Sequence, residues 1–109
     1  MVSGGVHLPD QAPARKIGEV RFVSIDAAEV RLTHGGYDTE RASQDPEVVF
    51  PAQTLRLLAE TWLIGSVAPT VPSTMGYIPR GADVLERVVP PVMASLVSQE
   101  VDLALLVPA

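Results

Sequence analysis

The run Val101-Asp102-Leu103-Ala104-Leu105-Leu106-Val107 is rich in branched apolar residues and decides the predicted fold. Such a run is typical of a strand that is covered on both faces, as the strands of a parallel sheet are. Ligands of open parallel sheets bind just beyond the carboxyl ends of the strands. Only Pro108 and Ala109 stand there. Either the site lies elsewhere or the rest of the domain is missing, and we favour the second interpretation.

A crossover unit is predicted in front of this strand. Residues 64–68 form a short strand candidate, and residues 81–100 carry apolar side chains at helical spacing. Asp83 is expected to be an N-cap or a first-turn acid of that helix, and Pro90-Pro91 is expected to kink or restart it. The three elements together would form a right-handed βαβ unit.

The clearest helix is predicted over residues 52–63. It follows Pro51, a residue that suits a helix start, and its apolar face ends at Trp62, which we expect in the core or at an interface. Further strands are predicted over residues 20–25 and 30–33, and loops over residues 41–47 and 69–80.

We therefore predict one α/β domain fragment over residues 1–109, with a largely parallel, doubly wound sheet. Residues 1–19 form a loop-rich start, and residues 20–109 supply the strand and helix units. Gly4-Gly5 is considered as an anion-binding turn after a first strand. Because only three residues precede that turn, we also expect that the start codon is placed too late.

Composition narrows the function classes. The 109 residues carry a net charge of −5, which argues against a nucleic-acid partner. No apolar stretch reaches the roughly 18 residues of a membrane span, so we expect no membrane partner and a cytoplasmic location. With 0 cysteines the chain has no thiolate nucleophile, and the spacing of His7 and His34 suggests no metal site.

Several short blocks occur in the order found in one protein family. They are Ser3-Gly4-Gly5-Val6-His7-Leu8, Leu32-Thr33-His34 with Tyr37-Asp38, Asp45 with Val48-Val49-Phe50-Pro51, Ile64-Gly65-Ser66-Val67-Ala68-Pro69, and Met75-Gly76-Tyr77. In these blocks the chain resembles the selenoprotein B component of glycine, sarcosine and betaine reductases, and its D-proline reductase relative. The blocks cover nearly the whole chain.

The resemblance implies a reductase that cleaves a C–N bond of a small amine or amino-acid substrate. In that family a selenocysteine or cysteine follows the last apolar strand, which here is the position after Ala109, and its selenolate or thiolate attacks the carbon next to the amine. A partner subunit with a pyruvoyl group holds the amine, and a thioredoxin-type reductant supplies electrons. We therefore expect no catalytic residue within the chain itself, no activity of the chain alone, and an oligomeric parent protein.

Eight residues are candidates for contact with the substrate or the nucleophile loop. His34, Tyr37 and Asp38 follow a predicted strand in a glycine-rich turn and could contact a carboxylate, or could simply cover the sheet edge. Gly65 and Ser66 could let a ligand approach the backbone, or could pack against a helix. Ser73, Met75 and Gly76 could line the pocket, or could belong to a plain proline-rich connector.

Three positions or segments depart from the family pattern. Glu47 stands where Asn is expected, Thr61-Trp62 replaces an acidic residue followed by glycine, and Val71-Pro72-Ser73-Thr74 lacks the usual aromatic residues.

Two alternatives to the reductase remain. One is a non-catalytic α/β module that binds a small ligand or a partner protein, and the other is an unrelated enzyme that uses His34 and Asp38 as acid and base. The reductase-fragment interpretation also predicts exposed apolar surface and poor solubility for the chain alone.

Overall fold

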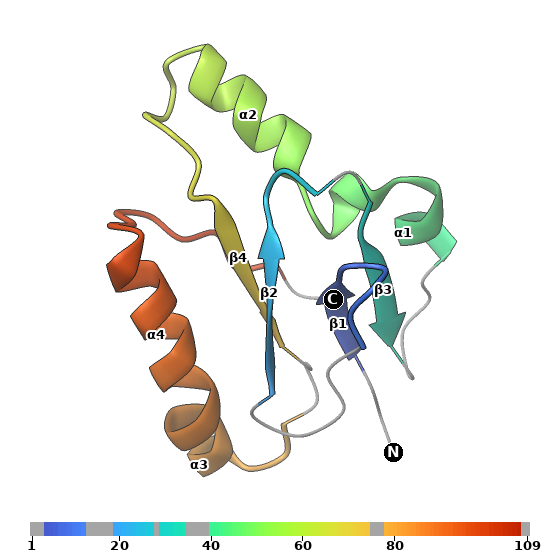
Figure 1. The fold of residues 1–109 in the computed structure, drawn as a ribbon, viewed down its shortest axis with the longest axis vertical. Coiled ribbons are helices and arrows are strands. Elements are labelled where there is room, and N and C mark those ends of the chain that lie inside the picture. The colour runs from blue at the N-terminus through green and yellow to red at the C-terminus, as the bar shows by residue number, and fades with distance from the viewer. Residues whose placement is uncertain (1–3, 13–18, 28, 35–39, 75–77, 108–109) are drawn as a thin grey trace.

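The structure is a computed structural model that describes residues 4–12, 19–27, 29–34, 40–74 and 78–107 (Figure 1). Its elements, in chain order, are the strands and helices β1 (Gly4–His7), β2 (Val20–Ser24), β3 (Arg31–His34), α1 (Glu40–Gln44), a 3₁₀ turn (Pro46–Val48), α2 (Ala52–Glu60), β4 (Thr70–Thr74), α3 (Gly81–Asp83), a π-helical segment (Val84–Val88) and α4 (Val89–Ser98).

The strands form two antiparallel pairs. β1 pairs with β3, with Val6 opposite Leu32, and β2 pairs with β4, with Phe22 opposite Pro72. The mixed helix and strand content fits an α/β domain. The predicted largely parallel, doubly wound sheet is not confirmed, because both strand pairs of the described residues run antiparallel.

The parallel sheet fails because neither strand of the expected crossover unit forms. Residues 64–68 are bends and irregular chain, and residues 101–107 are irregular and mostly exposed rather than paired. The strand of this region is instead β4, inside the segment 69–80 that was predicted to be a loop. β4 pairs back onto β2, and the bond from the Ile25 amide to the Pro69 carbonyl, at 2.8 Å, extends that pair.

Two further segments that were predicted as loops contain regular structure. The start over residues 1–19 contains strand β1, in which Gly4 and Gly5 pair with β3 instead of forming a turn. The segment 41–47 contains most of α1 and part of the 3₁₀ turn, which Asp45 caps by accepting a hydrogen bond from the Glu47 amide at 3.1 Å.

The helices agree better with the sequence. α2 begins after Pro51, as predicted, and Asp83 is a first-turn acid of α3. A restart at the prolines is not found, because residues 81–98 are helical without interruption. The π-helical segment leads directly into α4, whose first turn carries Pro90 and Pro91. Proline has no N–H to donate within a helix, and the change in helical bonding lies just before these two residues.

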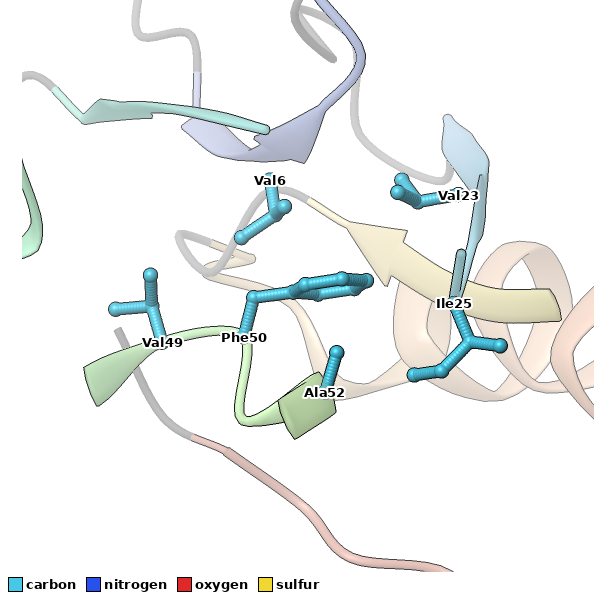
Figure 2. Close-up of a cluster of buried hydrophobic side chains, with 6 residues drawn as sticks. All are labelled: Val6, Val23, Ile25, Val49, Phe50 and Ala52. Atoms are coloured by element: carbon cyan, nitrogen blue, oxygen red, sulfur yellow. The ribbon is translucent and has the colours of Figure 1, made fainter. Parts of the chain in front are cut away.

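The core is small and lies between the two strand pairs and the start of α2. Figure 2 shows the ring of Phe50 among the aliphatic side chains of this cluster. Its buried members are Val6, Val23, Ile25, Val49, Phe50 and Ala52. Of these, only Val23 has no exposed surface. The cluster therefore depends on pairing between segments far apart in the sequence.

Much apolar surface stays outside this core, which confirms the predicted apolar exposure. The exposed large hydrophobic side chains include, on or after the helices, Leu57, Trp62, Leu63, Leu85, Val89, Met93, Val97, Leu103, Leu105, Leu106 and Val107. The carboxyl half of α4 and the chain after it line an open hollow that includes Met93, Val97 and Leu103. In Figure 1, α4 lies beside β4 and the chain that follows it crosses behind the strands.

Candidate functional site

Of the eight candidate residues, four lie outside the described part of the chain and a fifth, His34, is described by its backbone alone. Tyr37, Asp38, Met75 and Gly76 lie outside the described residues. His34 ends β3, and its backbone is paired opposite Gly4. The acid–base pair of His34 and Asp38, and the carboxylate contact of the glycine-rich turn, therefore stay predictions.

Ser73 is the candidate whose role the structure shows most clearly. Its hydroxyl oxygen accepts a hydrogen bond from the amide of Val6 at 2.8 Å. Ser73 lies in β4, opposite Arg21 of β2, whereas Val6 lies in β1. The hydroxyl thus joins one antiparallel strand pair to the other. The neighbouring Thr74 hydroxyl donates to the Glu19 carbonyl at 3.3 Å, so this edge of β4 is held by side-chain hydroxyls.

The Ser73→Ala variant is expected to lower the free energy of unfolding by about 1 kcal/mol, because the Val6 amide, in a buried residue, would lose its acceptor. Ser73→Thr keeps a hydroxyl and is the matched control. Urea denaturation measures the stability, and hydrogen exchange of the Val6 amide measures the local opening. A Ser73→Ala chain with unchanged stability and exchange would contradict the structural role of the hydroxyl.

Gly65 and Ser66 lie in an exposed bend, not in a strand as predicted. A side chain added at Gly65 would meet open space within 4 Å, so close packing against a helix does not explain this glycine. Approach of a ligand to the backbone here stays a prediction. The two residues follow α2 along the chain, whereas the Ser73 hydroxyl is bonded to β1. Among the described residues, no hydrogen bond joins Gly65 or Ser66 to Ser73.

A helix N-terminus is the usual protein group for stabilising a selenolate, a thiolate or a carboxylate. At α2 that place is filled from within the chain. The Glu47 carboxylate accepts hydrogen bonds from the Gln53 amide at 2.8 Å and from the Thr54 amide and hydroxyl at 3.4 and 3.1 Å. Glu47, at the position where the resemblance led us to expect Asn, therefore has a structural role, because its carboxylate bonds to the first turn of α2.

Two buried polar side chains were not singled out as site residues from the sequence. His7 is buried in β1, and its Nδ1 lies 2.8 Å from the Leu8 carbonyl oxygen. Asp83 is buried at the start of α3 and lies 3.8 Å from Arg80 Nε and 3.5 Å from Arg87 Nε. Arg80 lies three residues before Asp83, and Arg87 lies four residues after it. This helical spacing is the sequence signal that could have predicted the ion pairs of Asp83.

Within the described ranges no three His, Cys, Asp or Glu side chains gather closely enough to hold a metal ion. In the same ranges no helix has the length and hydropathy to cross a membrane. The described residues bring together a strand edge held by the Ser73 and Thr74 hydroxyls and a helix capped by Glu47, and the bonds of these groups lie within the chain. They supply no thiol, since the sequence has 0 cysteines.

The comparison with protein families identifies the chain. The family model of glycine/sarcosine/betaine reductase selenoprotein B matches residues 11–108. The chain therefore belongs to this family, as the order of its sequence blocks predicts. No curated protein and no solved structure matches the chain. The family is named for a selenoprotein, so its members are oxidoreductase components in which selenocysteine is the characteristic residue.

Proposed function

We propose that this chain is the substrate-side part of a cytoplasmic reductase of the selenoprotein B type, and that a selenocysteine or cysteine following Ala109 supplies the nucleophile. The family match over residues 11–108 carries the proposal. The absence of cysteine supports it, because the reacting chalcogen must then come from outside these 109 residues.

In the proposed reaction the selenolate or thiolate forms a bond to the carbon that bears the amine. The C–N electron pair leaves with the nitrogen, which takes up a proton. One thiol of a thioredoxin-type reductant then attacks the chalcogen, and the chalcogen–carbon bond breaks with its electron pair on carbon, which takes up a proton. The second thiol attacks the resulting mixed sulfide, so that the reductant becomes a disulfide and the selenolate or thiolate is restored. The pyruvoyl group of a partner subunit would hold the amine for the cleavage of the C–N bond. The role that we assign to this chain is to build the scaffold around the substrate, in which the Ser73 hydroxyl joins β4 to β1.

The proposal is tested first on the coding DNA and then on the protein. We expect codon 110 to be TGA or a cysteine codon, followed by an open frame with a further cysteine codon close behind. The longer protein, produced with selenocysteine insertion and combined with its partner subunit and dithiol, should release ammonia, methylamine or trimethylamine from glycine, sarcosine or betaine.

The matched control is the same protein with serine at the chalcogen position, which should release no amine above background. The 109-residue chain alone should also be inactive. An immediate second stop codon, or equal amine release by the serine control, would contradict the proposed function.

A further inference from the structure

Trp62 is the most exposed of the large hydrophobic side chains named for the described residues, with 91% of its surface accessible. Trp62 and Glu100 are also the two non-glycine residues of the described ranges with a positive φ, which is 64° at Trp62. A bulky residue in this left-handed region is disfavoured by contact between its Cβ and the backbone. Trp62 thus combines an unfavourable backbone conformation with a side chain that gains almost no burial within the chain.

The strain arises from the way in which α2 ends. The Leu63 amide donates to the Leu58 carbonyl at 3.0 Å, and the Trp62 amide donates to the Ala59 carbonyl at 3.2 Å. This bond pair defines a Schellman motif, and Trp62 occupies the position that usually requires glycine. Nothing in the described chain compensates for a tryptophan there, since the next residue, Leu63, is also exposed at 73%.

We propose that Trp62 and Leu63 form a docking knob for a partner protein whose contact surface carries a lysine or arginine beside an apolar pocket. Tryptophan is among the residues that most often dominate interface energetics, because its large ring fills a partner's pocket. The face of the same ring attracts a cation. The knob therefore fits a pocket with a basic rim.

The charges around the knob favour a basic partner. Glu60 is exposed in the last turn of α2, and that turn carries no basic residue to offset the negative end of the helix dipole. Arg56, the basic residue of α2, is engaged by the Asp26 carboxylate and by the Ile25 carbonyl at 3.0 Å. No ion pair of the described residues involves Glu60. A second copy of this chain is the less suitable occupant, because each copy carries a net charge of −5.

Docking predicts opposite effects of one substitution on stability and on binding. The Trp62→Gly variant should be more stable than the wild type and should bind the partner more weakly. Trp62→Gly removes the indole and relieves the positive φ, so the melting temperature of the chain should rise by about 4 °C. Glu100→Gly is the matched control, because Glu100 (φ 55°) occupies the same motif position at the end of α4, where the Val101 amide donates to the Leu96 carbonyl at 3.1 Å. It should stabilise the chain similarly and leave binding unchanged.

The binding probe is the purified pyruvoyl-containing subunit of the reductase complex, a choice that rests on the proposed function. Trp62 is the 1 tryptophan of the sequence, so a chain labelled with fluorotryptophan gives one fluorine resonance that reports on this side chain alone. Adding the subunit should shift that resonance. Trp62→Gly should weaken binding at least about 30-fold, as expected for a hot-spot tryptophan. Glu60→Gln should weaken it about 2- to 5-fold.

Each of the following outcomes overturns the inference, except the last, which bears on the proposed function alone. A lower melting temperature for Trp62→Gly would show that the indole is buried within the chain. Equal binding by the wild type and Trp62→Gly, or a resonance that the subunit does not move, would exclude this docking partner. A resonance that moves with the concentration of the chain alone would identify a second copy as the occupant. If the longer protein releases no amine, while Trp62→Gly still binds the subunit more weakly than the wild type does, only the proposed function is contradicted.

Discussion

The Phe50→Ala variant is expected to lose a large part of the chain's free energy of unfolding. Phe50 is 7% exposed, and its ring lies at the centre of the cluster in Figure 2. Removing a buried phenylalanine ring typically lowers the free energy of unfolding by about 3–5 kcal/mol, because burial is lost and a cavity is left. A domain of this size has a total stability of about 5–15 kcal/mol, with small cores near the lower limit. One side chain therefore accounts for much of the stability.

Phe22→Ala is the matched control for this prediction. Phe22 is the other phenylalanine of the chain, but it is 41% exposed on β2, so its truncation should cost about 1 kcal/mol or less. Circular dichroism during urea denaturation gives both values. If the two variants had the same unfolding midpoint, the cluster around Phe50 would not be the core of the chain in solution.

The sequence predicts local structure well where one segment decides its own conformation. The helix over 52–63 and the strand over 20–25 are found as α2 and β2, and α2 begins after Pro51 as predicted. Helical periodicity and proline geometry act within a few residues, so no distant partner is needed to anticipate them.

The sheet could not be predicted in the same way. β4 is Thr-Val-Pro-Ser-Thr, which looks like a proline-rich connector, and it becomes a strand through pairing with a segment about fifty residues earlier. Conversely, the apolar run 101–107 has the composition of a buried strand but finds no strand partner among the described residues. Apolar composition indicates what a segment would gain by burial, and it does not identify the surface that covers it.

The candidate site was predicted at the level of the family and only in part at the level of residues. The block order led to the selenoprotein B family, which the family match then showed. Ser73 was selected as a possible pocket residue, whereas the structure gives its hydroxyl a bond to Val6. The unusual conformation of Trp62 could not be predicted, because the sequence does not show that this residue adopts a positive φ.

The Gln99→Ala variant is expected to lower the free energy of unfolding by about 2–3 kcal/mol, because two backbone groups of Thr70 would lose their partners. Gln99 Oε1 accepts from the Thr70 amide at 2.8 Å, and Nε2 donates to the Thr70 carbonyl at 3.0 Å. Nε2 also lies 3.0 Å from the Ser95 hydroxyl oxygen, which orients the amide from within α4. The Gln99 side chain thus accepts from and donates to the backbone of Thr70, in the way that the backbone of a neighbouring strand would. These two bonds hold α4 beside β4.

Gln53→Ala is the control for this variant, since Gln53 is an exposed helical glutamine and its loss should change the stability by less than about 0.5 kcal/mol. Gln99→Glu tests the direction of the bonds, because an ionised carboxylate can accept from the Thr70 amide but cannot donate to the Thr70 carbonyl. It should fall between the wild type and Gln99→Ala in urea denaturation. Hydrogen exchange of the Thr70 amide should accelerate in Gln99→Ala. Unchanged exchange there would mean that α4 is held on β4 by its apolar contacts alone.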